Sequence, residues 1–185
     1  PGRTLLVGNP AFNRLGLQPV PINAEIDGVA LGLDTRPLFS SGGEIDTNLA
    51  IANREKFERE ILAPLYSAEG INTAQALRSS SEQMMQRLQQ MSVLDVLENL
   101  GYRYAATLDT QPITQGTVAL MTTTPGETGV ELVVSLRPSP WLDGRVTPIG
   151  KVVEGLSVIG GIGSIEVSPR HNAELATTIY SMRIL

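Results

Sequence analysis

The sequence of 185 residues contains no cysteine and a single histidine, His171. Disulfide bonds, thiolate metal sites and cysteine nucleophiles are therefore excluded. A transition-metal site would need carboxylates alone around that imidazole, which is an unusual ligand set. Residues 160–163 are rich in glycine but lack the lysine of a phosphate-binding loop, and they read as a turn. We therefore expect neither a metal nor another cofactor.

Basic residues are also few, with 14 Lys and Arg against 19 Asp and Glu, giving a net charge of -5. No basic cluster is present, so binding to nucleic acid is not expected. No apolar run approaches the roughly 20 residues that cross a bilayer, so we expect a soluble protein without a direct membrane span. The sequence begins at Pro1 rather than Met. This is compatible with a removed targeting segment and an exported or lumenal protein, but the compartment stays open.

Aromatic residues make up only 4% of the chain, whereas hydrophobic residues make up 42%. The core must therefore be built from aliphatic side chains and methionine. A chain of this length is typical of one domain with a substantial core. We predict a single domain over 1–185, with an irregular or extended segment at 1–43, a helical segment at 44–100 and a β-rich portion at 101–185.

The segment 1–43 is interrupted by Pro10, Pro19 and Pro21. Proline lacks the backbone donor that a sheet needs, so strands here are expected only as edge or loop segments. Two short runs, 4–7 and 24–33, are the candidate strands.

In the helical segment, apolar residues recur at three- and four-residue spacing and predict a first helix over 44–64, ended by Pro64. A second helix is expected to begin near Ser79–Ser81, where Ser and Glu or Gln have capping-box spacing. Its apolar stripe consists of Met84, Leu88 and Met91. A third helix is predicted over 93–100, with the capping pair Ser92 and Asp95 and a stop at Gly101.

The β-rich portion contains short apolar runs divided by glycine and proline turns. Such runs predict short strands and favour a barrel or half of a sandwich. The expected strands are 117–122, 130–136, 146–153, 165–167 and 177–185.

The most informative motif is Pro140-Trp141-Leu142-Asp143-Gly144-Arg145, followed by the run 150–155, Gly-Lys-Val-Val-Glu-Gly. Asp and Gly favour a tight turn between two strands. The motif resembles the cyclophilin-type peptidyl-prolyl isomerases, whose Trp-Leu-Asp-Gly turn and following strand form one wall of a proline-binding groove. The resemblance lies mainly within 100–185. It implies an α+β fold, with a cyclophilin-like, mainly antiparallel β-barrel and an enlarged helical N-terminal half.

The resemblance also shows which groove residues have changed. Prolyl isomerisation has a barrier of about 20 kcal/mol because the amide must lose its resonance. The family lowers it with an arginine, a glutamine and an apolar pocket. Here the glutamine position is Glu131, the pocket phenylalanine position is Val133, a histidine position is Val146 and a later phenylalanine position is Ile149, whereas Trp141 is kept. Arg14 has the spacing of the family arginine, but the segment that should follow it is absent.

Trp141 is interpreted either as a wall of this groove or as ordinary packing at a β corner. The resemblance implies a binding groove formed by a set of six residues. They are Trp141, Glu131, Val133, Met121, Thr122 and Ile149.

These observations favour a cyclophilin-like interaction module, non-catalytic or weakly catalytic, that is an accessory or assembly subunit of a protein complex. Its partner would be a protein, with a proline-containing or extended segment in the groove. One alternative is an active prolyl isomerase that uses Arg14, Arg36 or Arg103. Another is a purely architectural subunit whose groove is filled by the chain itself. Whether the chain is an enzyme stays open at this point.

Overall fold

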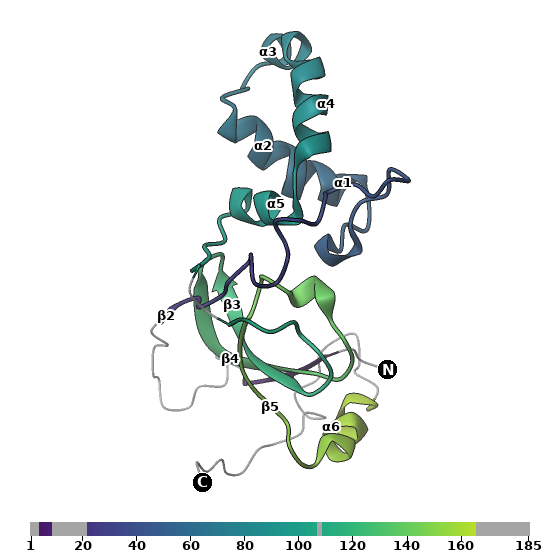
Figure 1. The fold of residues 1–185 in the computed structure, drawn as a ribbon, viewed down its shortest axis with the longest axis vertical. Coiled ribbons are helices and arrows are strands. Elements are labelled where there is room, and N and C mark those ends of the chain that lie inside the picture. Colours follow the sequence, from purple (N-terminus) through teal and green to yellow (C-terminus); the bar gives the residue numbers. More distant parts are fainter. Residues whose placement is uncertain (1–3, 9–21, 107–108, 166–185) are drawn as a thin grey trace.

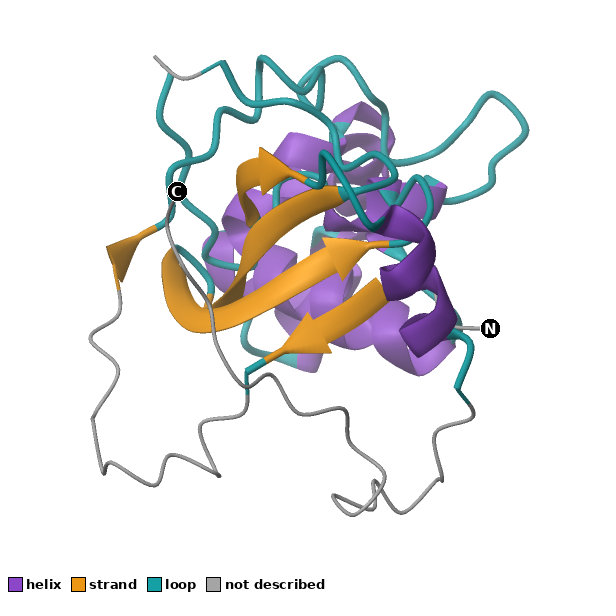
Figure 2. Cartoon of the chain, turned by 90° about the horizontal axis from the view of Figure 1, so that it is seen from below, coloured by secondary structure: helices purple, strands orange, loops and turns teal. Residues whose placement is uncertain are grey.

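The computed structural model describes residues 4–8, 22–106 and 109–165. The sheet lies at one end of the long axis and the helices α1 to α5 at the other, with α6 beside the sheet (Figure 1). Seen from below, the strands lie in front of the helices α1 to α5 (Figure 2). The strands are β1 (Thr4–Val7), β2 (Ile22–Asn23), β3 (Thr117–Thr124), β4 (Glu127–Ser135) and β5 (Thr147–Lys151).

The sheet is antiparallel throughout and has the order β1-β4-β3-β5, with β2 also paired to β4. The hairpin of β3 and β4 turns at Pro125-Gly126, where Gly126 has a φ of 88°. Within it Ala119 lies opposite Val133. The expected strands at 4–7, 117–122, 130–136 and 146–153 are confirmed, with small shifts at their ends. The expected strand 177–185 and most of 165–167 lie outside the described residues.

The first helix differs from the prediction at both ends. Residues 47–49 form a short 3-10 helix, η2 (Thr47–Leu49), capped by the Asp46 carboxylate, which accepts the Asn48 N–H at 2.8 Å. The long helix then runs through α1 (Arg54–Phe57), the π-helical turn η3 (Glu58–Leu62) and α2 (Ala63–Ala68). Pro64 therefore does not end it. Proline has no N–H to donate, and the wider π turn directly before it accommodates the missing hydrogen bond.

The next helices are α3 (Ala74–Ser79), α4 (Ser81–Gln90) and α5 (Val93–Asn99). The prediction missed α3, and the capping boxes expected at the start of α4 are wrong. Ser79 is the last residue of α3 and its hydroxyl donates to the Ala76 carbonyl at 3.0 Å, while Ser80 makes no side-chain cap. The capping box of α5 is confirmed: the Ser92 hydroxyl accepts the Asp95 N–H at 3.1 Å, and the Asp95 carboxylate accepts the Ser92 N–H at 2.8 Å.

Two further predictions are wrong. Residues 24–33 contain no strand, and residues 28–32 form successive turns, because the Asp27 carboxylate accepts the N–H groups of Val29 and Ala30, both at 2.9 Å. This local hydrogen bonding competes with strand formation. The expected turn at 160–163 is instead part of α6 (Leu156–Gly163), which begins after Gly155 with a φ of 78°.

The core has two parts, both mostly aliphatic as the scarcity of aromatic residues predicts. The smaller cluster lies against the sheet and contains buried Ile113, Ala119, Val133 and Val146. The larger cluster, which includes the predicted methionine stripe, consists of Leu33, Leu38, Leu49, Ile61, Leu65, Met84, Leu88, Met91, Val93, Val96 and Leu97.

No helix within the described ranges is long and apolar enough to cross a membrane.

Candidate functional site

The Trp141 turn is the 3-10 helix η4 (Pro140–Leu142), which connects β4 to β5 as the sequence motif predicts. A hydrogen bond closes the turn: the N–H of Leu142 donates to the Ser139 carbonyl at 2.9 Å. Gly144 follows with a φ of 76°, and a Cβ added there would lie 2.6 Å from Leu33 Cδ1. Both the left-handed conformation and the close contact require glycine at this position.

Asp143 holds this turn to the segment that leads into β3. Its side chain is 8% exposed, and its Oδ1 accepts the backbone N–H of Ile113 at 2.7 Å. Burial raises the pKa of the Asp143 carboxyl, against the opposing influence of the Ile113 hydrogen bond and of the Arg36 charge. The carboxylate is therefore occupied by a structural hydrogen bond.

Tyr104 fixes the same turn from the other side. Its hydroxyl donates to the Gly144 carbonyl at 2.9 Å. Burial is also the main reason why the pKa of Tyr104 lies well above its ordinary value, so the hydroxyl stays protonated and keeps donating. Asp143 and Tyr104 together leave the turn little freedom.

The residue predicted to form the floor of the groove, Val133, lies near the other groove residues but is covered by neighbouring side chains. Val133 is 2% exposed, and it packs with Ile113, Ala119 and Val146. Met121 and Leu142 are half-buried against the same cluster. At this position the chain's own aliphatic side chains occupy the space around the pocket residue.

The other predicted groove residues lie around this cluster in different settings. Trp141 and Glu131 are half-buried. Thr122 donates its hydroxyl to the Arg145 carbonyl and so connects β3 to the turn. Ile149 is the extra residue of a bulge in β5, between Pro148, opposite Ala119, and Gly150, and its side chain is 55% exposed. Arg14 lies outside the described residues.

Arg145 is a residue of this site that the sequence reasoning missed. Its guanidinium donates to the Leu49 carbonyl at 3.4 Å, across 96 positions of the chain, and lies 5.9 Å from the centroid of the Tyr102 ring. No local sequence pattern predicts a contact between residues so far apart in the chain. The one available signal was its place directly after the Asp-Gly turn.

An open hollow of about 350 Å³ lies near the β3–β4 turn and β2. Arg103 and Tyr104 line it together with Asn23 and Gly126. No cluster of three or more potential metal-ligating side chains occurs within the described residues. The arrangement around the turn therefore offers polar and apolar contact surface rather than a set of metal ligands.

Comparison with known proteins identifies the family. The family model for cyclophilin type peptidyl-prolyl cis-trans isomerase/CLD matches residues 44–184. The protein named peptidyl-prolyl cis-trans isomerase-like 1 from Neurospora crassa is 27% identical over 70 residues, which cover 38% of this chain and 43% of the relative.

The proteins of the same name from Bos taurus and Homo sapiens are each 32% identical over 53 residues, covering 29% of this chain and 32% of the relative. The matched stretches therefore span less than half the length of each of these relatives. The family model, by contrast, covers most of this chain, including the Trp141 turn and the strands around it. This chain belongs to the cyclophilin-type peptidyl-prolyl cis-trans isomerase family.

Proposed function

We propose that this chain is a cyclophilin-like interaction module that is non-catalytic or weakly catalytic and acts as an accessory or assembly subunit of a protein complex. The observation that carries the proposal is the burial of Val133, which is 2% exposed beneath neighbouring aliphatic side chains. By the resemblance, this position is the floor on which a proline ring would rest. A floor without accessible surface does not grip the ring.

The residues at the positions of the family's hydrogen-bonding side chains support the same proposal. Isomerisation is accelerated by hydrogen-bond donors aimed at the twisted amide. Glu131 stands at the family's glutamine position, and an ionised carboxylate accepts hydrogen bonds but donates none. Val146 stands at a histidine position and is buried with Val133. Neither residue replaces the lost donor.

In this proposal the partner is a protein, and a proline-containing or extended segment of it contacts Trp141, Glu131 and the exposed Ile149. The helical segment at 44–100 is proposed as a second contact surface. The chain is proposed to act as one domain.

The experiment is a titration of isotope-labelled protein with a short X-Pro peptide, followed through the indole N–H of Trp141, the chain's one tryptophan. The proposal predicts a saturable shift of that signal that Ile149→Ala weakens. Val158→Ala, at a position 65% exposed on α6, is the matched control and should leave the titration unchanged. Absence of any shift up to millimolar peptide contradicts groove binding.

The same buried cluster favours a second candidate, an architectural subunit in which the groove is filled by the chain. The two candidates differ in the role of Trp141. When the titration is followed through backbone amide signals, an interaction module loses peptide binding in Trp141→Ala while its fold is kept, whereas an architectural subunit binds no peptide in either form. An active isomerase would instead show accelerated exchange of the peptide itself.

A further inference from the structure

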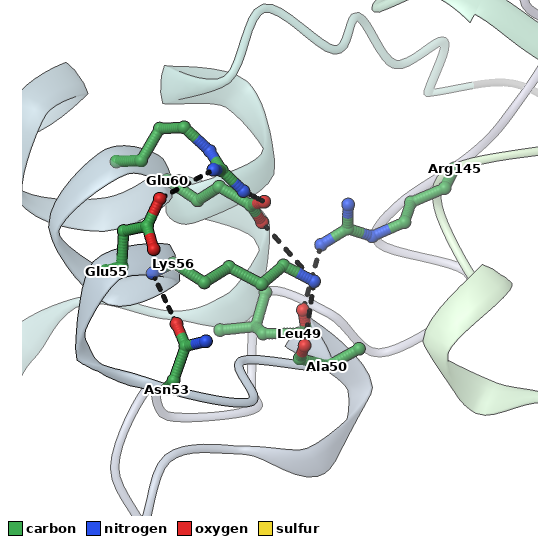
Figure 3. Close-up of polar contacts among 8 residues, drawn as sticks. Leu49, Ala50, Asn53, Glu55, Lys56, Glu60 and Arg145 are labelled. Carbon is green, nitrogen blue, oxygen red and sulfur yellow. Dashed lines mark hydrogen bonds and ion pairs between the residues drawn. The ribbon is translucent and has the colours of Figure 1, made fainter.

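The end of η2 presents two adjacent backbone carbonyls, and two cations from different parts of the chain bind them. Lys56 Nζ donates to the Ala50 carbonyl at 2.7 Å, and Arg145 Nη2 donates to the Leu49 carbonyl at 3.4 Å. Figure 3 shows the two side chains reaching this point from opposite sides. Carbonyls at the end of a helix lack intrahelical partners and carry partial negative charge, so cations stabilise them.

The backbone at this point is held in an unfavourable conformation. Ala50 has a φ of 52° and a ψ of 36°, and no other non-glycine residue within the described ranges has a positive φ. The left-handed region is disfavoured for a residue with a Cβ. Such a residue keeps that conformation only where its surroundings hold it. The two cations on the Leu49 and Ala50 carbonyls contribute to that hold, together with the Ala50 N–H, which donates to the Thr47 carbonyl at 3.1 Å.

The two cations are fixed to different elements. Lys56 lies in α1 and also faces Glu60 Oε2 at 3.9 Å, so it belongs to the helical segment 44–100. Arg145 follows η4: its N–H donates to the Leu142 carbonyl at 2.9 Å, and its carbonyl accepts the Thr122 hydroxyl. The main chain of Arg145 is therefore fixed to the turn and to β3, while its side chain reaches η2.

An arginine suits this position better than a lysine. The guanidinium lies 5.9 Å from the centroid of the Tyr102 ring, a cation–π distance, while one nitrogen faces Leu49. A planar guanidinium stacks and donates at the same time, which an ammonium group does less well. The helices η2 and η4 also pack against each other, so the polar contact closes an existing interface.

We propose that Arg145 is a positioning residue that couples the Trp141 turn to the helical segment. A displacement of residues 46–50 is transmitted through the Leu49 carbonyl and Arg145 to the turn, four residues along the chain from Trp141. The inference rests on the proposed function, in which Trp141 contacts a partner. The inference adds that binding of a protein to the helical segment changes the contact that Trp141 makes with its partner.

The test uses Trp141 fluorescence in the full chain without any partner. Because the chain contains one tryptophan, the signal reports on the turn alone. Lys56→Met releases the Ala50 carbonyl from within the helical segment, and we expect it to shift the emission maximum and raise acrylamide quenching of Trp141. In an Arg145→Met background, the same Lys56→Met change is expected to leave both quantities unaltered.

Arg54→Met is the matched control, because Arg54 lies on the same helix and pairs with Glu58 at 2.7 Å without reaching η2. It should not change the Trp141 signal. An equal effect of Lys56→Met with and without Arg145 overturns the proposal, as does the absence of any effect in the native background. If Arg145→Met does not fold, as judged by circular dichroism, Arg145→Lys takes its place and must reduce the Lys56→Met effect.

This test is independent of the proposed function. No peptide is present, so coupling can be found where the peptide titration fails, and peptide binding can be found where coupling is absent. Each result therefore identifies which of the two proposals is wrong.

Discussion

Asp143 Oδ1 accepts the backbone N–H of Ile113 at 2.7 Å, and this buried hydrogen bond ties the Trp141 turn to the segment that leads into β3. Asp143→Ala removes the acceptor and leaves the Ile113 N–H unsatisfied. A buried unsatisfied donor costs about 1–3 kcal/mol. We expect the free energy of unfolding, measured in urea, to fall by that amount.

Asp143→Asn is the matched variant, because its amide oxygen can still accept the Ile113 N–H. It should lose clearly less stability than Asp143→Ala. Equal losses for the two substitutions would show that the hydrogen bond does not stabilise the turn.

The same carboxyl predicts a pH dependence. Burial raises the pKa of Asp143 above its unfolded value, so between the two values the folded state binds more protons than the unfolded state. Its contribution to stability is therefore full below the unfolded pKa of about 3.9 and is lost as the pH rises through the higher folded pKa. As the pH rises over that range, wild type should lose unfolding free energy relative to Asp143→Asn. A constant difference contradicts the raised pKa.

Substitutions of Ser92 and Ser80, which precede α5 and α4, test whether the observed N-cap stabilises the protein. Ser92 bonds the Asp95 N–H, whereas Ser80 makes no side-chain cap. Loss of an N-cap hydrogen bond costs about 1 kcal/mol. Ser92→Ala should therefore lower the unfolding free energy by about that amount, and Ser80→Ala should change it by less than about 0.5 kcal/mol. Similar losses at both positions would contradict the observed capping.

Val133→Phe restores the residue type that the family carries at this position. Val133 already packs among buried aliphatic side chains, so the larger ring overfills the cluster. Overpacking of a core costs about 1–3 kcal/mol. The matched control is Ile149→Phe at a half-exposed position of β5, where little loss is expected. A Val133→Phe variant as stable as wild type would show that the floor has room for a ring.

Local sequence signals predicted the parts of the fold that depend on nearby residues. The capping box of α5 joins residues three positions apart, and the β3–β4 hairpin follows from two apolar runs around Pro125-Gly126. The Trp141 turn was likewise predicted from its own Pro, Asp and Gly. Each of these signals acts within a few residues, which is why it could be read directly.

Other features depend on competition or on distant contacts. The run 24–33 has the composition of a strand, but the Asp27 side chain captures two nearby N–H groups and forms turns instead. The glycines of 160–163 indicate a turn, yet they lie within α6. The burial of Val133 and the contact of Arg145 with Leu49 depend on segments distant in sequence. No local pattern predicts them.

The central proposal is that this family member catalyses prolyl isomerisation weakly or not at all. Uncatalysed exchange of an X-Pro bond takes tens to hundreds of seconds, so even weak catalysis is visible by NMR exchange spectroscopy on a short peptide. We predict that the folded chain, added at a concentration comparable to the peptide, leaves the cis–trans exchange rate close to its uncatalysed value. A clear, concentration-dependent acceleration would contradict the proposal and make the chain an active isomerase.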